Sequence, residues 1–137
     1  MTAAIGTSSI NVLLIEPDRL VRSTVAAVCR DLEIVRMHEA TSLAMGEQWL
    51  RAWPADGLIL ALSDPDAALD LLSRLRAGEF PSGAGIPVAV MASVCDADMI
   101  KRVKGLEVRR FLLQPFKLRE VIQTIEQLWP AREKIDA

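Results

Sequence analysis

The sequence predicts one domain of the α/β class, in which a parallel sheet is covered by helices on both faces. Its short, nearly continuous apolar runs are typical of strands that are buried on both sides. These runs alternate with segments whose apolar residues recur every three or four positions, as they do on one side of a helix. Five such strand–helix pairs within 137 residues favour three layers with right-handed crossovers.

Five segments have the character of strands. Four of them are apolar runs, at residues 10–15, 57–62, 87–91 and 108–113. The last run is the most polar, because it contains Arg109 and Arg110. A weaker fifth segment, residues 34–37, is predicted to lie at an edge of the sheet.

Five further segments have the apolar periodicity of helices: residues 21–32, 43–53, 68–75, 99–103 and 118–128. Asp18, Ser42, Asp64 and Asp96 precede four of them and are predicted N-caps. The signal is strongest at Asp64, because a proline follows it at the first helical position. In sheets of this class ligands bind at the carboxyl ends of the strands, and candidate functional residues are therefore sought there.

Composition excludes several classes of function. The net charge of −2 gives no global field for nucleic acid or membrane. Cys29 and Cys95 lack the spacing of a metal site or a disulfide framework, which fits a reducing compartment. There is no signal-peptide pattern, and no apolar run approaches the ~20 residues that span a bilayer. We therefore expect a cytoplasmic protein with a flexible N-terminal tail (1–9), a domain (10–129) and a C-terminal tail (130–137).

Four stretches carry a resemblance to a known family: residues 12–18 (VLLIEPD), 69–76 (LDLLSRLR), 86–91 (IPVAVM) and 111–116 (FLLQPF). Their order and spacing resemble the receiver domain of two-component response regulators, over residues 11–128. The resemblance implies a flavodoxin-like (CheY-like) fold, a three-layer (βα)5 sandwich whose parallel sheet has the order 2-1-3-4-5.

The resemblance fails where the family carries its chemistry. Receivers accept a phosphoryl group on an aspartate at the end of the third strand, and this chain has Ala61 there. Two neighbouring carboxylates that hold magnesium become Glu16 and Pro17. The hydroxyl after the fourth strand becomes Ala92, and the lysine after the fifth becomes Gln114. Phosphoryl transfer depends on positioned charge, so the four losses together indicate a pseudo-receiver.

Other family features are kept. Phe111 matches the aromatic switch position, and Pro115 matches a proline whose preceding peptide bond is cis in the family. Seven cationic residues, here called the basic face, fall in the predicted fourth helix, fifth strand and fifth helix: Lys101, Arg102, Lys104, Arg109, Arg110, Lys117 and Arg119. In the resembled family this surface docks partners or a second receiver; the alternative is an ordinary solvated surface.

The sequence therefore predicts a signalling protein that is not phosphorylated, is not an enzyme, and uses no cofactor or metal. Its expected partner is a protein: a sensor kinase, another regulator or an output protein, with a homodimer through the basic face as a further option. Nucleic acid is not an expected partner, because the chain has no helix-turn-helix or basic arm, and membrane is not expected because the net charge gives no global field.

Several alternatives accompany this interpretation. The chain is a phosphorylatable receiver if Asp64 is a relocated acceptor and Glu16 with Asp18 binds Mg²⁺ weakly. We instead expect both aspartates to cap helices and Glu16 to be solvated. A nucleotide binder is disfavoured, because no glycine-rich loop follows the first strand. The tryptophans, including Trp53, are expected to pack in the interior. The domain either stands alone or begins a longer regulator.

Overall fold

The computed structural model describes residues 10–130. The tail predicted at residues 1–9 lies outside the described residues, as does all but the first residue of the tail predicted at 130–137. The strands are β1 (Asn11–Ile15), β2 (Arg36–Ala40), β3 (Gly57–Ala61), β4 (Val88–Ala92) and β5 (Arg110–Leu113). The helices are α1 (Arg19–Leu32), α2 (Leu43–Ala52), α3 (Pro65–Arg76), α4 (Ala97–Gly105) and α5 (Leu118–Leu128).

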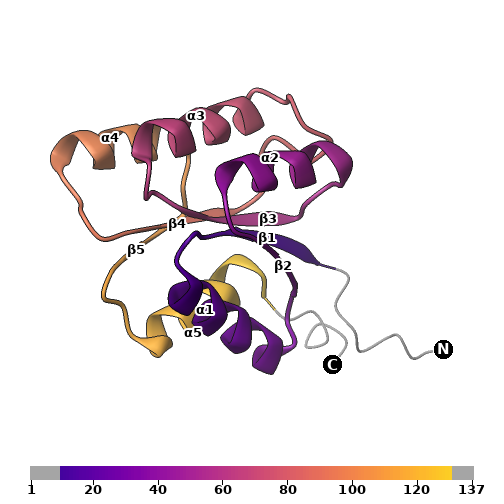
Figure 1. Cartoon of the computed structure of the whole chain (residues 1–137), viewed down its shortest axis with the longest axis vertical. Helices are drawn as coiled ribbons and strands as arrows, with labels where there is room; N and C mark the ends of the chain where they lie inside the picture. Colours follow the sequence, from indigo (N-terminus) through magenta and orange to yellow (C-terminus); the bar gives the residue numbers. More distant parts are fainter. Residues whose placement is uncertain (1–9, 131–137) are drawn as a thin grey trace.

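The five strands form one parallel sheet in the order β2-β1-β3-β4-β5. Figure 1 shows α2, α3 and α4 over one face of the sheet and α1 with α5 over the other. This arrangement confirms the predicted flavodoxin-like class and its strand order. No helix in residues 10–130 has the length and apolar character needed to cross a membrane.

The predicted edge strand was placed too early. The sequence indicated residues 34–37, whereas β2 runs from Arg36 to Ala40. An edge strand pairs on one side only, so β2 carries polar side chains that weaken its apolar signal. One of them, His38, lies 4.9 Å from the ring of Trp49, and its Nε2 lies 2.9 Å from Oδ1 of Asn11.

The sheet separates two apolar clusters. Because side chains alternate along a strand, Leu13 and Ile15 face α2, α3 and α4, while Val12 and Leu14 face α1 and α5. The central strands β3 and β4 are buried along their whole length. This double burial explains their continuous apolar sequences, and it fixes which side of the sheet each strand-end residue occupies.

The predicted N-caps are confirmed. Each capping side chain accepts a main-chain N–H from the first turn of its helix: Asp18 from Val21, Ser42 from Met45, Asp64 from Ala67 and Asp96 from Met99. These bonds satisfy amides that the helix itself leaves unpaired. They also fix where the loops after β1, β2, β3 and β4 end, at one edge of the sheet.

One predicted packing residue is exposed. Helix α2 ends at Ala52, and Trp53 is its C-cap in an extended conformation, so its side chain leaves the buried side and is 61% exposed. Trp129 does pack as expected and is 4% exposed. Its indole N–H donates to the carbonyl of Asp56 at 3.2 Å. The ring also lies against Gly57, where a side chain would overlap it.

We expect Gly57→Ala to lower the free energy of unfolding by about 1–3 kcal/mol, because the added methyl group overlaps the Trp129 ring. Urea unfolding measures the change. Gly85→Ala is the matched control: its Cβ meets no atom within 4 Å, so its effect should stay within about 0.5 kcal/mol. Equal unfolding midpoints for the two variants would contradict the packing described for Trp129.

Candidate functional site

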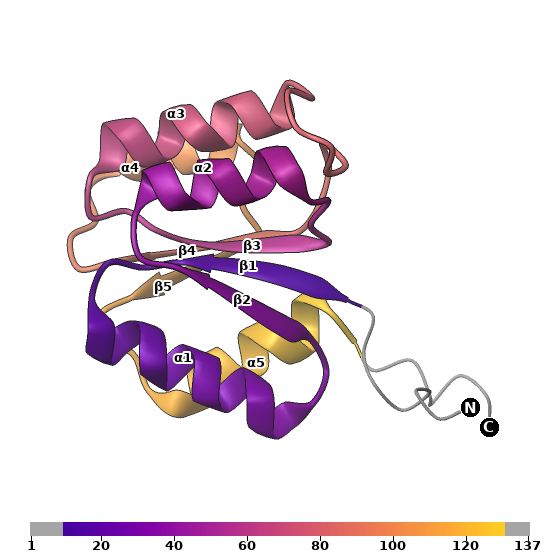
Figure 2. The same ribbon diagram turned by 45° about the vertical axis from the view of Figure 1, so that its right-hand side comes forward.

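The candidate site lies at the edge of the sheet where the strands end. Figure 2 shows the loops that follow the strands gathered at the left. Parallel pairing of β1 with β3 sets Ile15 opposite Leu60. The next residues along these strands, Glu16 and Ala61, are therefore neighbours on one side of the sheet.

Ala61 is the last residue of β3 and is 5% exposed. It belongs to the cluster between the sheet and helices α1 and α5, together with Leu14 and Met91. A methyl side chain offers no nucleophile, so an acyl phosphate cannot form at this position.

Ala92 occupies the other side of the sheet. It ends β4, is 5% exposed, and belongs to the cluster under α2, α3 and α4. The nearest hydroxyl along the chain, that of Ser93, belongs to an exposed residue beyond the strand. Ala61 and Ala92 thus pack into different apolar clusters, on opposite sides of the sheet. Neither residue contributes a polar side chain to the edge where the strands end.

At the end of β5, the edge of the sheet carries the neutral amide side chain of Gln114. Gln114 is half-buried, and its main-chain N–H donates to the carbonyl of Ala92 at 2.7 Å. The Gln114–Pro115 peptide bond is cis. Phe111 is half-buried and packs against the cluster under α2, α3 and α4.

Glu16 is buried, and the prediction of a solvated carboxylate was wrong. The residue is 3% exposed. Its Oε2 accepts the N–H of Asp18 at 3.0 Å, and its Oε1 is buried without a hydrogen-bond partner. The sequence suggested solvation because acidic residues are seldom buried. Here the turn into α1 folds the side chain inward, onto the amide of Asp18.

Arg22 is hydrogen-bonded to the turn that carries Glu16, through main-chain carbonyls. The guanidinium of Arg22 donates to the main-chain carbonyls of Glu16 at 2.9 Å and Pro17 at 3.3 Å. It also lies 3.5 Å from the carboxylate of Glu39 on β2. Arg22 therefore fastens the turn after β1 to the neighbouring strand. Sequence reasoning missed this role, because a single arginine in a first helical turn gives no pattern.

Desolvation by burial raises the pKa of the Glu16 carboxyl above its usual 4.5. The hydrogen bond from the Asp18 amide opposes the shift, the negative charge of Asp18 adds to it, and the charge of Arg22 opposes it. Ionising a buried carboxylate costs free energy when only one of its two oxygens accepts a hydrogen bond. The protonated form of Glu16 is therefore more favoured in this site than it would be in water.

The other acidic candidates act as helix caps. Asp18 accepts the N–H of Val21 through Oδ1 at 3.0 Å, and Asp64 accepts that of Ala67 at 3.4 Å. Within residues 10–130, no three side chains of the His, Cys, Asp and Glu types come together in a group that could hold a metal ion. Pro17 is exposed and supplies only a carbonyl to the turn.

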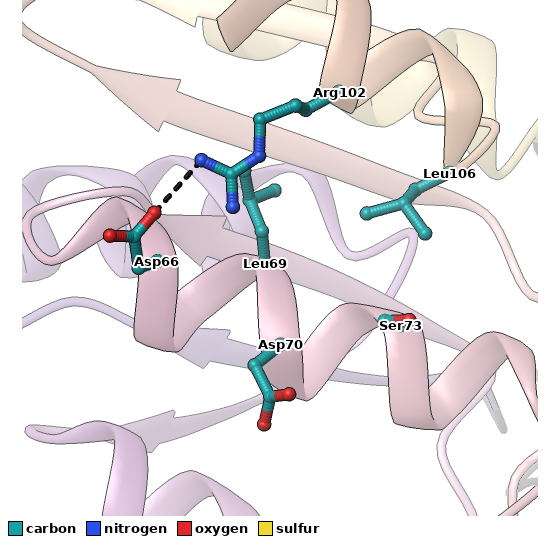
Figure 3. Close-up of a pocket in the computed structure, with 6 residues that line it drawn as sticks. All are labelled: Asp66, Leu69, Asp70, Ser73, Arg102 and Leu106. Atoms are coloured by element: carbon teal, nitrogen blue, oxygen red, sulfur yellow. Dashed lines mark hydrogen bonds and ion pairs between the residues drawn. The ribbon is translucent and has the colours of Figure 1, made fainter.

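The basic face is only partly assembled. Arg102 turns toward α3, and its guanidinium pairs with Asp66 at 2.9 Å. Figure 3 shows this pair over a groove between α3 and α4, which Leu69 and Leu106 also line. Arg110 donates to the side chain of Gln127 on α5 at 3.1 Å. The other five cations of the basic face are exposed: Lys101, Lys104, Arg109, Lys117 and Arg119.

Comparison with known proteins bears on the fold. No family model and no curated protein matches the sequence. Solved structures do match. A response regulator from Thermotoga maritima has 20% identity and a TM-score of 0.76, covering 89% of this chain and 98% of that one. A signal receiver domain of a two-component histidine kinase from Clostridium thermocellum has 15% identity and a TM-score of 0.79, with the same coverage.

An orphan response regulator from H. pylori gives a similar result, with 17% identity and a TM-score of 0.77 over 90% of this chain and 98% of that one. At identities this low the likeness establishes the fold alone. The chain therefore has the fold of a receiver domain, and the chemistry at its strand ends must be argued from its own residues.

We expect Glu16→Gln to remove a pH dependence of stability. A raised folded-state pKa means that the stabilising effect of the bound proton is complete below about 4.5 and is lost as the pH rises through the raised value. The variant should match the wild type near pH 4.5 and be more stable at pH 7 to 8. Urea unfolding at several pH values measures the difference.

The matched control is Glu126→Gln, which removes an exposed carboxylate on α5. Its unfolding free energy should follow the wild type within about 0.5 kcal/mol at each pH. A Glu16→Gln protein that loses stability at neutral pH would mean that the ionised carboxylate stabilises the turn, contrary to the geometry described.

Proposed function

We propose that this chain is a receiver-like signalling protein that accepts no phosphoryl group, is not an enzyme, and acts by binding another protein in a two-component or phosphorelay pathway. The observation that carries the proposal is Ala61, a buried methyl group at the end of β3, where the receiver fold holds its acceptor. A ligand or modification shifts a switch only through differential affinity for its states. Without an acceptor, sequence and partner alone set the balance between states.

The surroundings of Ala61 support the proposal. Transferring a phosphoryl group requires compensation of its developing charge, mainly by metal ions and cations. Pro17 gives no carboxylate for magnesium, Ala92 gives no hydroxyl, and Gln114 gives no cation. The remaining acid, Glu16, is buried with one oxygen unpaired. Its charge opposes rather than assists an incoming phosphoryl group.

The basic face is the proposed partner surface. Figure 1 shows α4, β5 and α5 together at one end of the sheet, and β5 is an edge strand. Arg109 precedes β5 and Arg110 begins it. A cluster of cations beside an open strand edge suits an acidic protein surface, which electrostatic attraction would steer into place. The proposed partner is a sensor kinase, another regulator or an output protein.

Incubation with an acyl phosphate and Mg²⁺ should leave the intact mass of the chain unchanged, because position 61 has no carboxylate. Addition of Mg²⁺ alone should leave the melting temperature unchanged. The control variant carries all four groups of a phosphorylatable receiver together: Pro17→Asp, Ala61→Asp, Ala92→Thr and Gln114→Lys. It tests whether this scaffold can take up a phosphoryl group at all. An adduct of one phosphoryl group on the native chain that Asp64→Asn abolishes would establish the relocated acceptor instead.

Reversal of two charges tests the partner surface. Capture of partners from native cell extract should fall by at least about tenfold in the variant Arg109→Glu/Arg110→Glu, because opposed charges become like charges. The matched control reverses two exposed arginines elsewhere, Arg30→Glu and Arg36→Glu, and should capture as the wild type does. If the first variant captures as much partner as the wild type does, the basic face is not the partner surface.

A further inference from the structure

One arginine outside the basic face holds the main chain on which that face is built. Arg76 is the last residue of α3, and it is half-buried. Its guanidinium donates from all three nitrogen atoms to four main-chain carbonyls: those of Ala84 at 2.7 Å, Ile86 at 2.8 Å, Leu106 at 2.9 Å and Glu107 at 3.2 Å. Because the donors of a guanidinium spread in a planar fork, one side chain can serve carbonyls of separate segments.

These carbonyls belong to two segments that are not adjacent in sequence. Ala84 and Ile86 lie in the loop that leads from α3 into β4, whereas Leu106 and Glu107 lie in the turn between α4 and β5. Leu106 is the C-cap of α4, at a helix end where carbonyls lack partners within the helix. Arg76 therefore ties the end of α4 to the end of α3. Figure 3 shows Leu106 at the end of α4, across the groove from α3.

The turn after α4 has a conformation that needs support. Glu107 has a φ of 57°, in the left-handed region that residues other than glycine seldom adopt. Such a backbone persists where its surroundings fix it. Here the amide of Glu107 donates to the carbonyl of Lys104 at 3.0 Å, and its own carbonyl accepts from Arg76. Both polar main-chain groups of this residue are thus bonded.

Helix α4 depends on this turn, because few other contacts anchor the helix. Val103 is its one buried residue, whereas α3 buries five. Met99 is only partly buried against the apolar cluster below the helix. The ion pair of Arg102 with Asp66 joins two exposed side chains, and exposed pairs contribute little to stability. The position of α4 over the sheet is therefore set largely by its two ends.

The same turn joins two parts of the basic face. Lys101 and Lys104 precede it on α4, and Arg109 follows it at the start of the path into β5. The amide of Arg109 donates to the carbonyl of Val88 at 2.9 Å, which fixes the second part to the sheet. The first part moves with α4. The distance between the two parts consequently depends on the turn that Arg76 holds.

We propose that Arg76 is a positioning residue for the partner surface: it sets the spacing of the α4 cations relative to the cations of β5. The inference rests on the proposed function, in which the basic face binds an acidic protein surface. Electrostatic attraction falls with distance, so cations that are shifted match a given pattern of carboxylates less well. Lysine cannot replace Arg76 in this role, because an ammonium carries three donors on a single nitrogen atom.

Amide hydrogen exchange on the full chain tests the contact with no partner present. In Arg76→Lys, which keeps the positive charge, the amides of residues 97–108 should exchange at least about tenfold faster than in the wild type. The matched control is Arg74→Lys on the same helix, because the guanidinium of Arg74 pairs with Glu47 and Asp70 instead. This control should exchange as the wild type does over the same residues. Unchanged exchange of β1 shows that the sheet stays folded in both variants.

Partner capture tests the positioning. The readout is the protein that the wild type captures from native cell extract and that Arg109→Glu/Arg110→Glu does not capture. Its capture should fall at least about fivefold in Arg76→Lys and stay at the wild-type level in Arg74→Lys. Arg76→Ala should lose both protection and capture. Millimolar guanidinium ion should restore both by binding the vacated carbonyls, whereas sodium chloride at the same concentration should not.

Wild-type protection or wild-type capture in Arg76→Lys would overturn the inference, as would a loss in Arg76→Ala that guanidinium does not repair. Failure of the proposed partner surface gives a different result. In that case Arg109→Glu/Arg110→Glu captures as the wild type does, or the wild type captures nothing, while exchange of α4 still responds to Arg76→Lys. The positioning role then falls together with the surface.

Discussion

The parallel pairing of β1 with β3 is the constraint on which the rest of the site depends. It brings the first residue after β1 and the last residue of β3 side by side, on the side of the sheet covered by α1 and α5. One of these neighbours, Glu16, is a buried acid with an unpaired oxygen. The other must then be uncharged unless a cation or a metal ion accompanies it, and Ala61 meets that requirement.

The electrostatics of the crevice are consistent with this pairing. Two buried carboxylates in contact repel each other, and desolvation adds to the cost. Working sites offset such a cost with metal ions and cations. Here Arg22 is committed to main-chain carbonyls and to Glu39, and Gln114 is neutral. Ala61, Pro17 and Gln114 are therefore mutually compatible, and a single acid placed at position 61 would lack compensation.

Buried and exposed side chains give the two aspects of the edge where the strands end. Ala61 and Ala92 pack inward there and offer no polar side-chain group, and Glu16 is the buried acid beside them. Residues that point outward, such as Leu20 and Val94, offer apolar area with charges on either side. The proposed binding of a protein would use these features, because burial of apolar surface drives association while charge at the border selects the partner.

The sequence alone determined the fold class, because the apolar runs and helical stripes are local patterns whose periods differ. It also determined the four helix caps, which depend on residues adjacent in the chain, and it identified Ala61 by its place at a strand end. Only the tertiary structure decided that Glu16 is buried, that Arg22 fastens its turn, that Trp53 is exposed and that Arg102 turns toward α3. Burial and pairing of these side chains depend on neighbours distant in sequence, and no local pattern specifies such neighbours.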